Sequence, residues 1–294
     1  NLTLRDKLLT ALGRSRAGKR ALMIRSDSGG FLYTENFQKI ATKLEYMRRS
    51  MDKKIFMFTS VAENEGKSTV TSNLALSLAE RGNRVLLMDF DFRKPALYKI
   101  FEVDVPRETE LGELLSGKLD VREFRFLQYR QSSLFLAINR HAYFDYADWM
   151  ASPDVRAKLD LFRNMFDYIL IDTPPVYAAP DVVSMTSLAD VTMLVLRTDV
   201  AEVADVNDTI LEIRAHKGHF GGCILNDVHR DFNLFGQTGS DEAGYYKKGY
   251  GYGRYGKYGK YGRYGNYGKY GAYDKFDRFD SDFDSGAGQS DGKH

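Results

Sequence analysis

The stretch from residue 55 to residue 80 limits the fold of this chain more than any other part of its sequence. The apolar run Ile-Phe-Met-Phe at 55–58 predicts a buried strand, and residues 70–79 carry apolar side chains on one face of a helix. The turn between them ends in Gly66, Lys67, Ser68 and Thr69. Backbone N–H groups and the helix dipole both favour an anion at such a helix N-terminus. The pattern therefore predicts a phosphate-binding loop.

Two chemical roles follow from the Gly-Lys-Ser/Thr pattern. Lys67 would reach the β- and γ-phosphate oxygens of a nucleotide, and Ser68 would ligate Mg²⁺. The full motif has a glycine five residues before Gly66, where this chain has Val61. The alternative interpretation, an ordinary helix N-terminus beside a lysine, therefore stays open at this point.

Composition limits the class of protein. The 294 residues suit one sizeable α/β domain with additional segments, and the formal net charge of +2 neither favours nor excludes a nucleic-acid partner. The single cysteine, Cys223, excludes a disulfide framework, and we expect it to be buried because it lies in an apolar run. No apolar run approaches the ~18 residues of a membrane span, so we expect a soluble chain. Its start at Asn1 is consistent with a piece of a longer protein.

Residues 1–34 form a basic N-terminal segment. Two interpretations are open: a solvated helix and linker, or a juxtamembrane segment on the cytoplasmic side of a membrane, where basic residues face anionic lipid. Thr34 can cap the next helix, so we place the domain boundary there. The apolar stripe of that helix consists of Phe37, Ile40, Leu44, Met47 and Met51.

Acidic and amide side chains follow three further apolar runs. Asp89 and Asp91 come after a predicted strand at 84–88, Asp172 ends one at 168–172, and Asn226 ends one at 223–226. Because unpaired carboxylates beside buried strands are costly, we favour function over solvated turns for the acids. Asn226 has two open interpretations, an adenine contact or a plain turn residue.

Strands and helices alternate along the chain, with further predicted strands at 134–138 and 191–196 and a helix at 203–216. This alternation predicts an α/β fold with a doubly wound, mainly parallel sheet flanked by helices. The carboxyl ends of its strands would bring the acids and the Gly-Lys-Ser loop to one rim, where such sheets bind ligands. The sequence therefore predicts a single Mg·nucleotide site.

Three stretches together resemble the bacterial tyrosine kinases, which are the cytoplasmic kinase modules of capsular and exopolysaccharide co-polymerases. They are Glu-Gly-Lys-Ser-Thr at 65–69, Leu-Leu-Met-Asp-Phe-Asp-Phe-Arg-Lys-Pro at 86–95 and Ile-Leu-Ile-Asp-Thr-Pro-Pro at 169–175. The second is similar to that family's additional Walker A′ motif, and the third has the form of a Walker B segment. The resemblance implies a P-loop NTPase-like kinase domain, placed here at 35–235, that binds ATP and Mg²⁺.

The resemblance also assigns roles to residues. Lys67 would hold the β/γ-phosphates, Ser68 the Mg²⁺ and Thr69 the α-phosphate, in one ATP-binding loop with Glu65 and Gly66. Asp89 would accept the proton of an incoming tyrosine, Asp91 would support the metal shell, and Asp172 would hold Mg²⁺ through water.

Two departures from related families bear on assembly. The tyrosine kinases carry a Glu-x-x-Arg-x-x-Arg helix that builds a ring of subunits, whereas the helix here keeps Glu35 but has Gln38 and Ala41 in place of the arginines. A ring is therefore in doubt, although Arg48 and Arg49 could substitute. Partitioning and Min-type ATPases carry a second lysine early in the loop, where this chain has Ala62.

Residues 236–294 form a predicted flexible tail rich in tyrosine and glycine. The candidate phosphorylation sites are Tyr245, Tyr246, Tyr250, Tyr252, Tyr255, Tyr258, Tyr261, Tyr264, Tyr267, Tyr270 and Tyr273. Basic residues alternate with these tyrosines, a pattern that could bind single-stranded nucleic acid, but a kinase core beside them explains them better, and no nucleic acid is expected. The acidic stretch at 274–284 has no assigned role.

The resulting hypothesis is an ATP·Mg-dependent protein-tyrosine autokinase that phosphorylates its tail between subunits and regulates polysaccharide polymerisation or export. Expected partners are further copies of the chain, a membrane-spanning adaptor or N-terminal half, the polysaccharide assembly machinery and a tyrosine phosphatase, at the cytoplasmic side of the inner membrane. The alternatives are a nucleotide-dependent assembly switch without kinase activity and a tail-driven interaction module.

Overall fold

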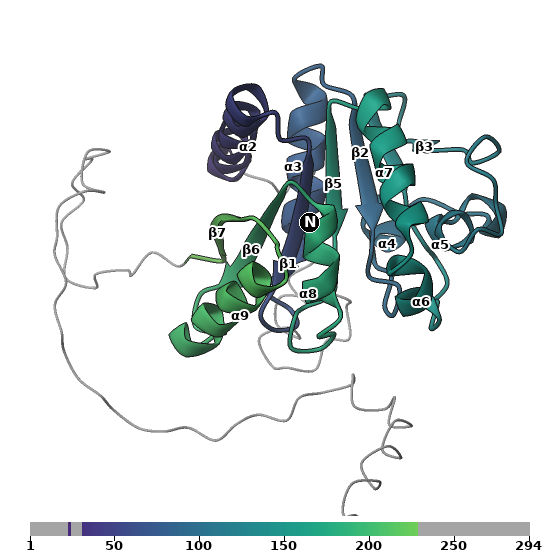
Figure 1. Cartoon of the computed structure of the whole chain (residues 1–294). Coiled ribbons are helices and arrows are strands. Elements are labelled where there is room, and N and C mark those ends of the chain that lie inside the picture. The colour runs from purple at the N-terminus through teal and green to yellow at the C-terminus, as the bar shows by residue number, and fades with distance from the viewer. Residues whose placement is uncertain (1–22, 25–30, 229–294) are drawn as a thin grey trace, which may run out of the picture. The chain divides into compact units, whose positions relative to one another are not determined.

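The computed structural model describes residues 23–24 and 31–228, and its centre is a 7-stranded sheet (Figure 1). The strand order is β3-β4-β2-β5-β1-β6-β7, and neighbours pair in parallel except β3 with β4. The strands are β1 (Ile55–Ser60), β2 (Val85–Asp89), β3 (Leu127–Gln128), β4 (Leu134–Ala137), β5 (Tyr168–Asp172), β6 (Val191–Arg197) and β7 (Phe220–Asn226). The predicted mainly parallel α/β sheet is confirmed, while the short β3 was not foreseen.

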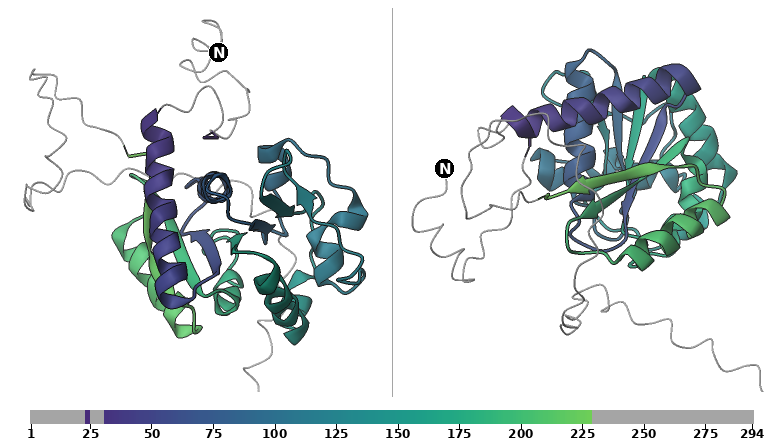
Figure 2. Two further views of the ribbon diagram at one scale, coloured as in Figure 1. Left: turned by 90° about the horizontal axis from the view of Figure 1, so that it is seen from above. Right: turned by 90° about the vertical axis from the view of Figure 1, so that its left-hand side faces the viewer.

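Helices cover both faces of this sheet (Figures 1 and 2). They are α2 (Phe31–Met51), α3 (Lys67–Glu80), α4 (Leu97–Phe101), α5 (Leu111–Leu115), α6 (Tyr146–Met150), α7 (Pro153–Met165), α8 (Val182–Met185) and α9 (Val203–Ala215), with single turns η1 (Arg107–Thr109) and η2 (Thr186–Leu188). Phe56 and Phe58 of β1 pack in one core with α2 and α3, whereas Ile55 and Met57 pack in a second core with α5, α6 and α7. Alternate side chains of a strand thus enter opposite cores.

Helix α3 is enclosed on all sides. Every residue from 70 to 79 is buried, although the sequence pattern predicted a single apolar face. The reason is α2, which packs over the outer side of α3 and contributes Phe37 and Leu44 to the same core. At the far end of α3, Arg81 fixes this contact by an ion pair of 2.9 Å with Glu45 of α2.

The start of α2 differs from the sequence prediction. The helix begins at Phe31, so Thr34 lies within its first turns rather than at its cap. The predicted apolar stripe is present, except that Met51 is 60% exposed. The proposed domain boundary at residue 34 stays a prediction, and the tail tyrosines lie outside the described residues. Among the described residues no helix is long and apolar enough to cross a membrane.

Cys223 is exposed, which corrects the expectation of a buried thiol. It lies on β7, the last strand of the sheet, and within the described part of the chain β7 pairs only with β6. Its neighbour Leu225 is exposed as well. An apolar run on an edge strand therefore need not be covered on both faces.

A partly buried carboxylate anchors the first strand. Asp190 accepts hydrogen bonds from the N–H groups of Lys54 (2.8 Å) and Ile55 (2.9 Å) and pairs with Arg163. Burial by itself would raise the pKa of this carboxyl, but these hydrogen bonds outweigh burial and lower the pKa below its ordinary value.

Candidate active site

The phosphate-loop prediction corresponds to a tight turn between β1 and α3. Gly66 precedes α3 in the left-handed region, with φ of 87°, and its carbonyl accepts the N–H of Val70 at 2.9 Å. Asn64 is also left-handed, with φ of 64°, whereas Val61 is not among the residues with positive φ. The loop therefore takes its unusual backbone at 64 and 66, and position 61 does not need the glycine of the full motif.

Glu65 and Asn226 support this loop through hydrogen bonds. The buried carboxylate of Glu65 accepts the N–H of Ala62 at 2.8 Å, and burial raises its pKa against the opposing backbone hydrogen bonds. Asn226, at the end of β7, donates its Nδ2 to the Glu65 carbonyl at 2.9 Å. A Cβ atom on Gly66 would lie 2.2 Å from that Nδ2. Asn226 therefore braces the loop; the predicted adenine contact is not tested by this arrangement.

Asp89 and Asp172 end two neighbouring strands at the rim of the sheet. They are register partners of β2 and β5, and both side chains are buried. Asp89 Oδ1 accepts the N–H of Asp91 at 3.0 Å, and its Oδ2 accepts the N–H of Leu97 at 3.5 Å. Asp89 thus shapes the turn that carries Asp91 as well as contributing charge.

Lys67 lies among these acids. Its Nζ is 3.7 Å from Asp91 Oδ2 and donates to Ser68 Oγ at 3.2 Å. Burial would lower the pKa of Lys67, but the charges of Asp172, Asp91 and Asp89, with a smaller contribution from Glu63, raise it. The lysine is therefore charged at neutral pH within a mainly acidic cluster.

The charge of Lys67 alone does not balance the three carboxylates of this cluster. Burial, then the charges of Asp172 and Asp91, raise the pKa of Asp89 well above its ordinary value. Burial likewise raises the pKa of Asp172 to about 6, against the charge of Lys67 and a hydrogen bond from Ser68. Asp172 Oδ1 is buried and has no hydrogen-bond partner among the described residues. A further positive charge would satisfy both the unpaired oxygen and the excess of carboxylates.

Mg²⁺ fits this donor set. It prefers oxygen ligands and usually keeps waters and substrate phosphates beside one or two protein carboxylates. Within the described part of the chain no group of at least 3 His, Cys, Asp or Glu side chains forms a complete metal site. Asp172 and Ser68 are the oxygen-bearing side chains at this rim that could hold the ion.

Asn139 is a site residue that the sequence analysis missed. Its fully buried amide donates to the Asp89 carbonyl at 3.0 Å and accepts the N–H of Gly112 at 2.8 Å. It therefore ties the acidic turn to α5. The available signal was its position two residues after β4, at the same carboxyl rim as Asp89.

Two cationic side chains secure the turn after Asp91. Arg93 pairs with Asp181 at 3.2 Å, and Lys94 lies 3.7 Å from Glu63 of the phosphate loop. The Lys94 contact joins the acidic turn to the loop. The Arg-Lys pair of the Walker A′-like stretch thus has a structural use here.

The structure brings together most of the residues selected from sequence. Lys67, Ser68, Asp89, Asp91 and Asp172 form one cluster, and Glu65, Gly66 and Asn226 adjoin it through the loop. Thr69 lies in the first turn of α3, where its carbonyl accepts Asn73 Nδ2 at 2.9 Å. The individual catalytic, metal and nucleotide roles remain predictions.

Comparison with known proteins agrees with this geometry. Residues 59–217, more than half of the chain, match the model of a family described as AAA domain. The putative tyrosine-protein kinase EpsB of Ralstonia solanacearum is 27% identical over 218 residues, which are 74% of this chain but 28% of EpsB. The tyrosine-protein kinase CpsD of Streptococcus pneumoniae serotype 4 is 29% identical, over 62% of this chain and 80% of CpsD.

A solved structure has a similar fold. The BceF tyrosine kinase domain superposes with a TM-score of 0.63 at 25% identity, covering 76% of this chain and 89% of that domain. The mainly parallel sheet with its flanking helices is thus that of a P-loop NTPase-like fold. The chain belongs to the AAA domain family, and the relatives that it resembles there are bacterial tyrosine kinases.

Proposed function

We propose that this chain is an ATP·Mg-dependent protein-tyrosine kinase that phosphorylates tyrosines of its own C-terminal segment at 245–273. The observation that carries the proposal is the position of Lys67 and Ser68, at the start of α3, against Asp89, Asp91 and Asp172. The names of the relatives support transfer to tyrosine rather than to water.

Each group has a distinct task in this proposal. The loop N–H groups and Lys67 bind the phosphates, with Thr69 at the α-phosphate, and Ser68 and Asp172 hold Mg²⁺. The bound ion would neutralise charge on the β- and γ-phosphates. Asp89 accepts the proton of the tyrosine hydroxyl, a task helped by its raised pKa, and Asp91 orients Lys67.

The tail supplies the acceptor in this proposal. Within an assembly of copies, a tail tyrosine held next to a neighbour's site would have a local concentration of up to about millimolar, so it would compete well with free substrates. Each phosphate adds about −1.5 to −2 charges, which would repel a modified tail from the acidic pocket. Autophosphorylation would thus be self-limiting.

Arg48 and Arg49 of α2 are the candidate substitutes for the ring-forming arginines, and Arg48 is not available for that role. Arg48 donates to Asp167 at 2.8 Å and lies 5.2 Å from the Tyr168 ring centroid, so it is engaged within its own subunit. Arg49 is the remaining substitute for the missing arginines. We propose a self-associating kinase with a membrane-bound adaptor or N-terminal half, on the cytoplasmic side of the inner membrane. There it would serve the polysaccharide assembly machinery and be reversed by a tyrosine phosphatase.

The test is phosphotyrosine formation with ATP and Mg²⁺, mapped by mass spectrometry. Lys67→Met and Asp89→Asn should each lower labelling by at least about 100-fold, as expected for loss of a transition-state contact. Lys118→Met, at an exposed position, should label like wild type. Labelling of both site variants at the wild-type rate would refute the kinase assignment. Hydrolysis of ATP without phosphotyrosine would favour the alternative, a nucleotide-dependent assembly switch, against which Ala62 counts.

A further inference from the structure

The 139–143 segment, which follows β4, is held against the acidic turn at two points. Asn139 Nδ2 donates to the carbonyl of Asp89 at 3.0 Å, and the N–H of Tyr143 donates to the carbonyl of Phe92 at 2.9 Å. These two carbonyls begin and end the acidic turn. The place of the segment therefore decides the place of the turn.

A buried carboxylate holds the 139–143 segment from its other side. The side chain of Glu110 is 0% exposed, and its Oε2 accepts the hydroxyl of Tyr143 at 2.9 Å and the N–H of His141 at 3.4 Å. Its Oε1 lies 2.5 Å from Nδ1 of His141. A buried carboxylate is costly unless hydrogen bonds or a charge partner offset its lost hydration. Glu110 therefore stabilises the arrangement in which this segment lies against it.

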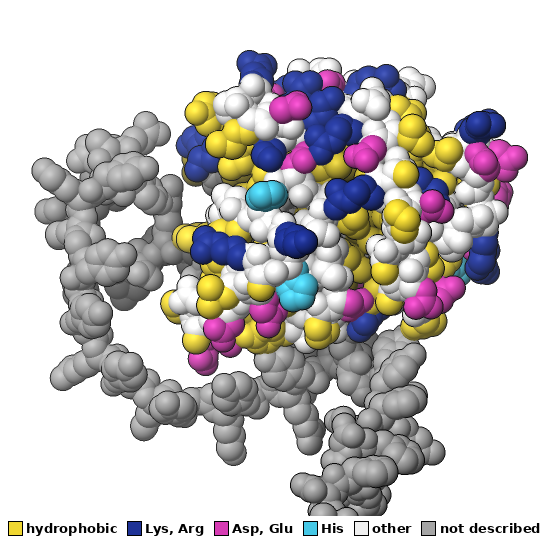
Figure 3. All heavy atoms as spheres, viewed as in Figure 1, with side chains coloured by type: hydrophobic (Ala, Val, Ile, Leu, Met, Phe, Trp, Pro, Cys, Tyr) yellow, Lys and Arg dark blue, Asp and Glu magenta, His cyan; other side chains and the backbone are white. Residues whose placement is uncertain are grey.

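The contacts of Glu110 continue to the surface of the molecule. The side chain of His141 is 54% exposed, and Glu113 Oε1 lies 3.1 Å from the Tyr143 hydroxyl and accepts Nε of Arg107 at 3.2 Å. Figure 3 shows acidic and basic side chains side by side where Figure 1 places α5 and α6. Burial, followed by the hydrogen bond with Glu110, raises the pKa of Tyr143. The hydroxyl therefore keeps its proton and stays a donor to this pair of carboxylates.

Helix α5 fills the space behind the segment. Gly112 donates its N–H to Asn139 Oδ1 at 2.8 Å, and a Cβ atom on Gly112 would lie 2.4 Å from the ring of Tyr143. Leu111 donates its N–H to the carbonyl of Ile138 at 3.2 Å. The segment is thus packed between α5 and the acidic turn, and a shift of the segment breaks at least one of these contacts.

The acidic turn needs support from outside because its carboxylates repel one another. The charges of Asp172 and Asp91 both act on Asp89, whereas the cation Lys67 lies 3.7 Å from Asp91. Repulsion between like charges favours a wider turn. Contacts that tie the turn to the rest of the domain keep the carboxylates at their positions.

We propose that Glu110 is a positioning residue for Asp89 and Asp91, and that it acts through the 139–143 segment. The phosphate loop is held separately, by the hydrogen bond from Asn226. Loss of Glu110 should therefore slow transfer of the phosphoryl group and leave nucleotide binding unchanged. The kinetic consequence rests on the proposed function, whereas the position of the turn is measured without it.

The test compares two substitutions of Glu110 in the full chain. Glu110→Met has a similar length but a poor acceptor, so it should lower the turnover number for phosphotyrosine formation at least about tenfold and change the KM for ATP less than about twofold. Glu110→Gln keeps an oxygen for the Tyr143 hydroxyl and a nitrogen that can donate to a neutral His141 ring, so its turnover should stay within about threefold of wild type. A merely structural role would not separate turnover from the KM for ATP.

Native-state hydrogen exchange measures the turn without reference to activity. The peptide at 89–95 should exchange at least about fivefold faster in Glu110→Met than in wild type, because the segment that ties the turn is loosened. If Glu110→Met does not fold, Tyr143→Phe removes only the hydroxyl, and it should show both effects at about threefold.

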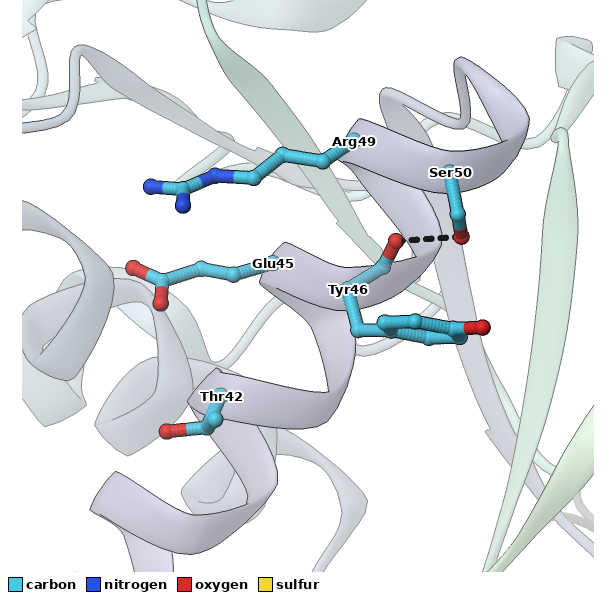
Figure 4. A pocket seen from close by; sticks show the side chains of 5 residues that line it. All are labelled: Thr42, Glu45, Tyr46, Arg49 and Ser50. Atoms are coloured by element: carbon cyan, nitrogen blue, oxygen red, sulfur yellow. Dashed lines mark hydrogen bonds between the residues drawn. The ribbon is translucent and has the colours of Figure 1, made fainter.

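A matched control makes the same substitution on α2. Glu45 also pairs with a cation, Arg81 at 2.9 Å, and Figure 4 shows it on the same side of the helix as Thr42, beside a hollow of about 420 Å³. Glu45→Met should lower the free energy of unfolding but leave turnover and the exchange of 89–95 unchanged.

Wild-type turnover in Glu110→Met would overturn the positioning role while the kinase assignment stands. So would a fall in turnover that Glu45→Met reproduces or that an equal loss of nucleotide affinity accompanies. A wild-type chain that forms no phosphotyrosine would refute the kinase assignment instead. Hydrogen exchange would then decide the positioning role alone: unchanged exchange at 89–95 in Glu110→Met overturns it, and faster exchange supports it.

Discussion

Replacing Gly66 by alanine should damage the phosphate loop in two separable ways. An alanine at φ of 87° costs about 1–2 kcal/mol in backbone strain. Its Cβ would also lie 2.2 Å from Asn226 Nδ2, so the amide must move and lose its 2.9 Å hydrogen bond to the Glu65 carbonyl. That loss adds about 1 kcal/mol. We therefore expect Gly66→Ala to lower the free energy of unfolding by about 2–3 kcal/mol.

The chain offers a matched control in Gly82. Its φ is 83°, but no atom lies within 4 Å of the position that a Cβ would occupy, so Gly82→Ala should show the strain cost alone. In an Asn226→Ala background the clash is absent, and Gly66→Ala should then cost no more than Gly82→Ala. Urea denaturation of the four variants measures these differences, and titration with a fluorescent ATP analogue should show at least about tenfold weaker binding for Gly66→Ala and unchanged binding for Gly82→Ala.

Equal destabilisation by Gly66→Ala and Gly82→Ala would refute the bracing role of Asn226. Unchanged nucleotide affinity in a destabilised Gly66→Ala variant would show that the loop geometry described here does not govern binding. Either result would remove a premise of the proposed site.

Other predictions concern single groups. Without Mg²⁺, Asp172 should lower the free energy of unfolding by about 2 kcal/mol as the pH rises from 4 to 7, because its folded-state pKa is about 6 and its folded state binds the proton more tightly. Asp172→Asn should reduce this fall and leave the part that comes from the raised pKa of Asp89. Asp190→Ala should cost about 2–3 kcal/mol at pH 7. The Asp190 contribution is present above pH ~4 and is lost as the pH falls through its lowered folded-state pKa. Cys223 should react with a maleimide in the native protein.

Each of these has an outcome that contradicts it. Chemical denaturation across the pH range should separate wild type from Asp172→Asn, and identical curves would mean that this carboxyl is not buried as described. If Asp190→Ala leaves the free energy of unfolding unchanged, β1 does not depend on the hydrogen bonds that Asp190 accepts. Cys223 that reacts only after denaturation would restore the buried thiol predicted from sequence.

The sequence was most informative where strands are buried on both faces. β1, β2 and β5 are buried along their whole length, so each reads as an unbroken apolar run ended by a polar rim residue. Edge elements gave weaker signals. β3 has 2 residues and therefore no periodicity, and β7 keeps Cys223 exposed despite its apolar surroundings.

Within the site, sequence reasoning identified the charges but not their supports. Lys67 and the three aspartates occur in recognisable local patterns. Asn139 does not, because its contact with Asp89 spans 50 positions and depends on how β4 lies beside β2. The hydrogen bond from Asn226 to the Glu65 carbonyl spans 161 positions, and local sequence could not predict it either. Local sequence predicts which groups reach the rim, while tertiary contacts decide how each is held.

The enclosure of α3 beneath α2 has a thermodynamic consequence. Helix α3 begins at Lys67 and packs against α2 on its outer side. A ligand that displaces α2 therefore changes the packing of α3, and with it the environment of the phosphate loop. Linkage then requires reciprocity: if a ligand bound to α2 changes the nucleotide affinity by some factor, the nucleotide changes the affinity of that ligand by the same factor. A thermodynamic cycle between the two ligands would measure one coupling constant from both directions.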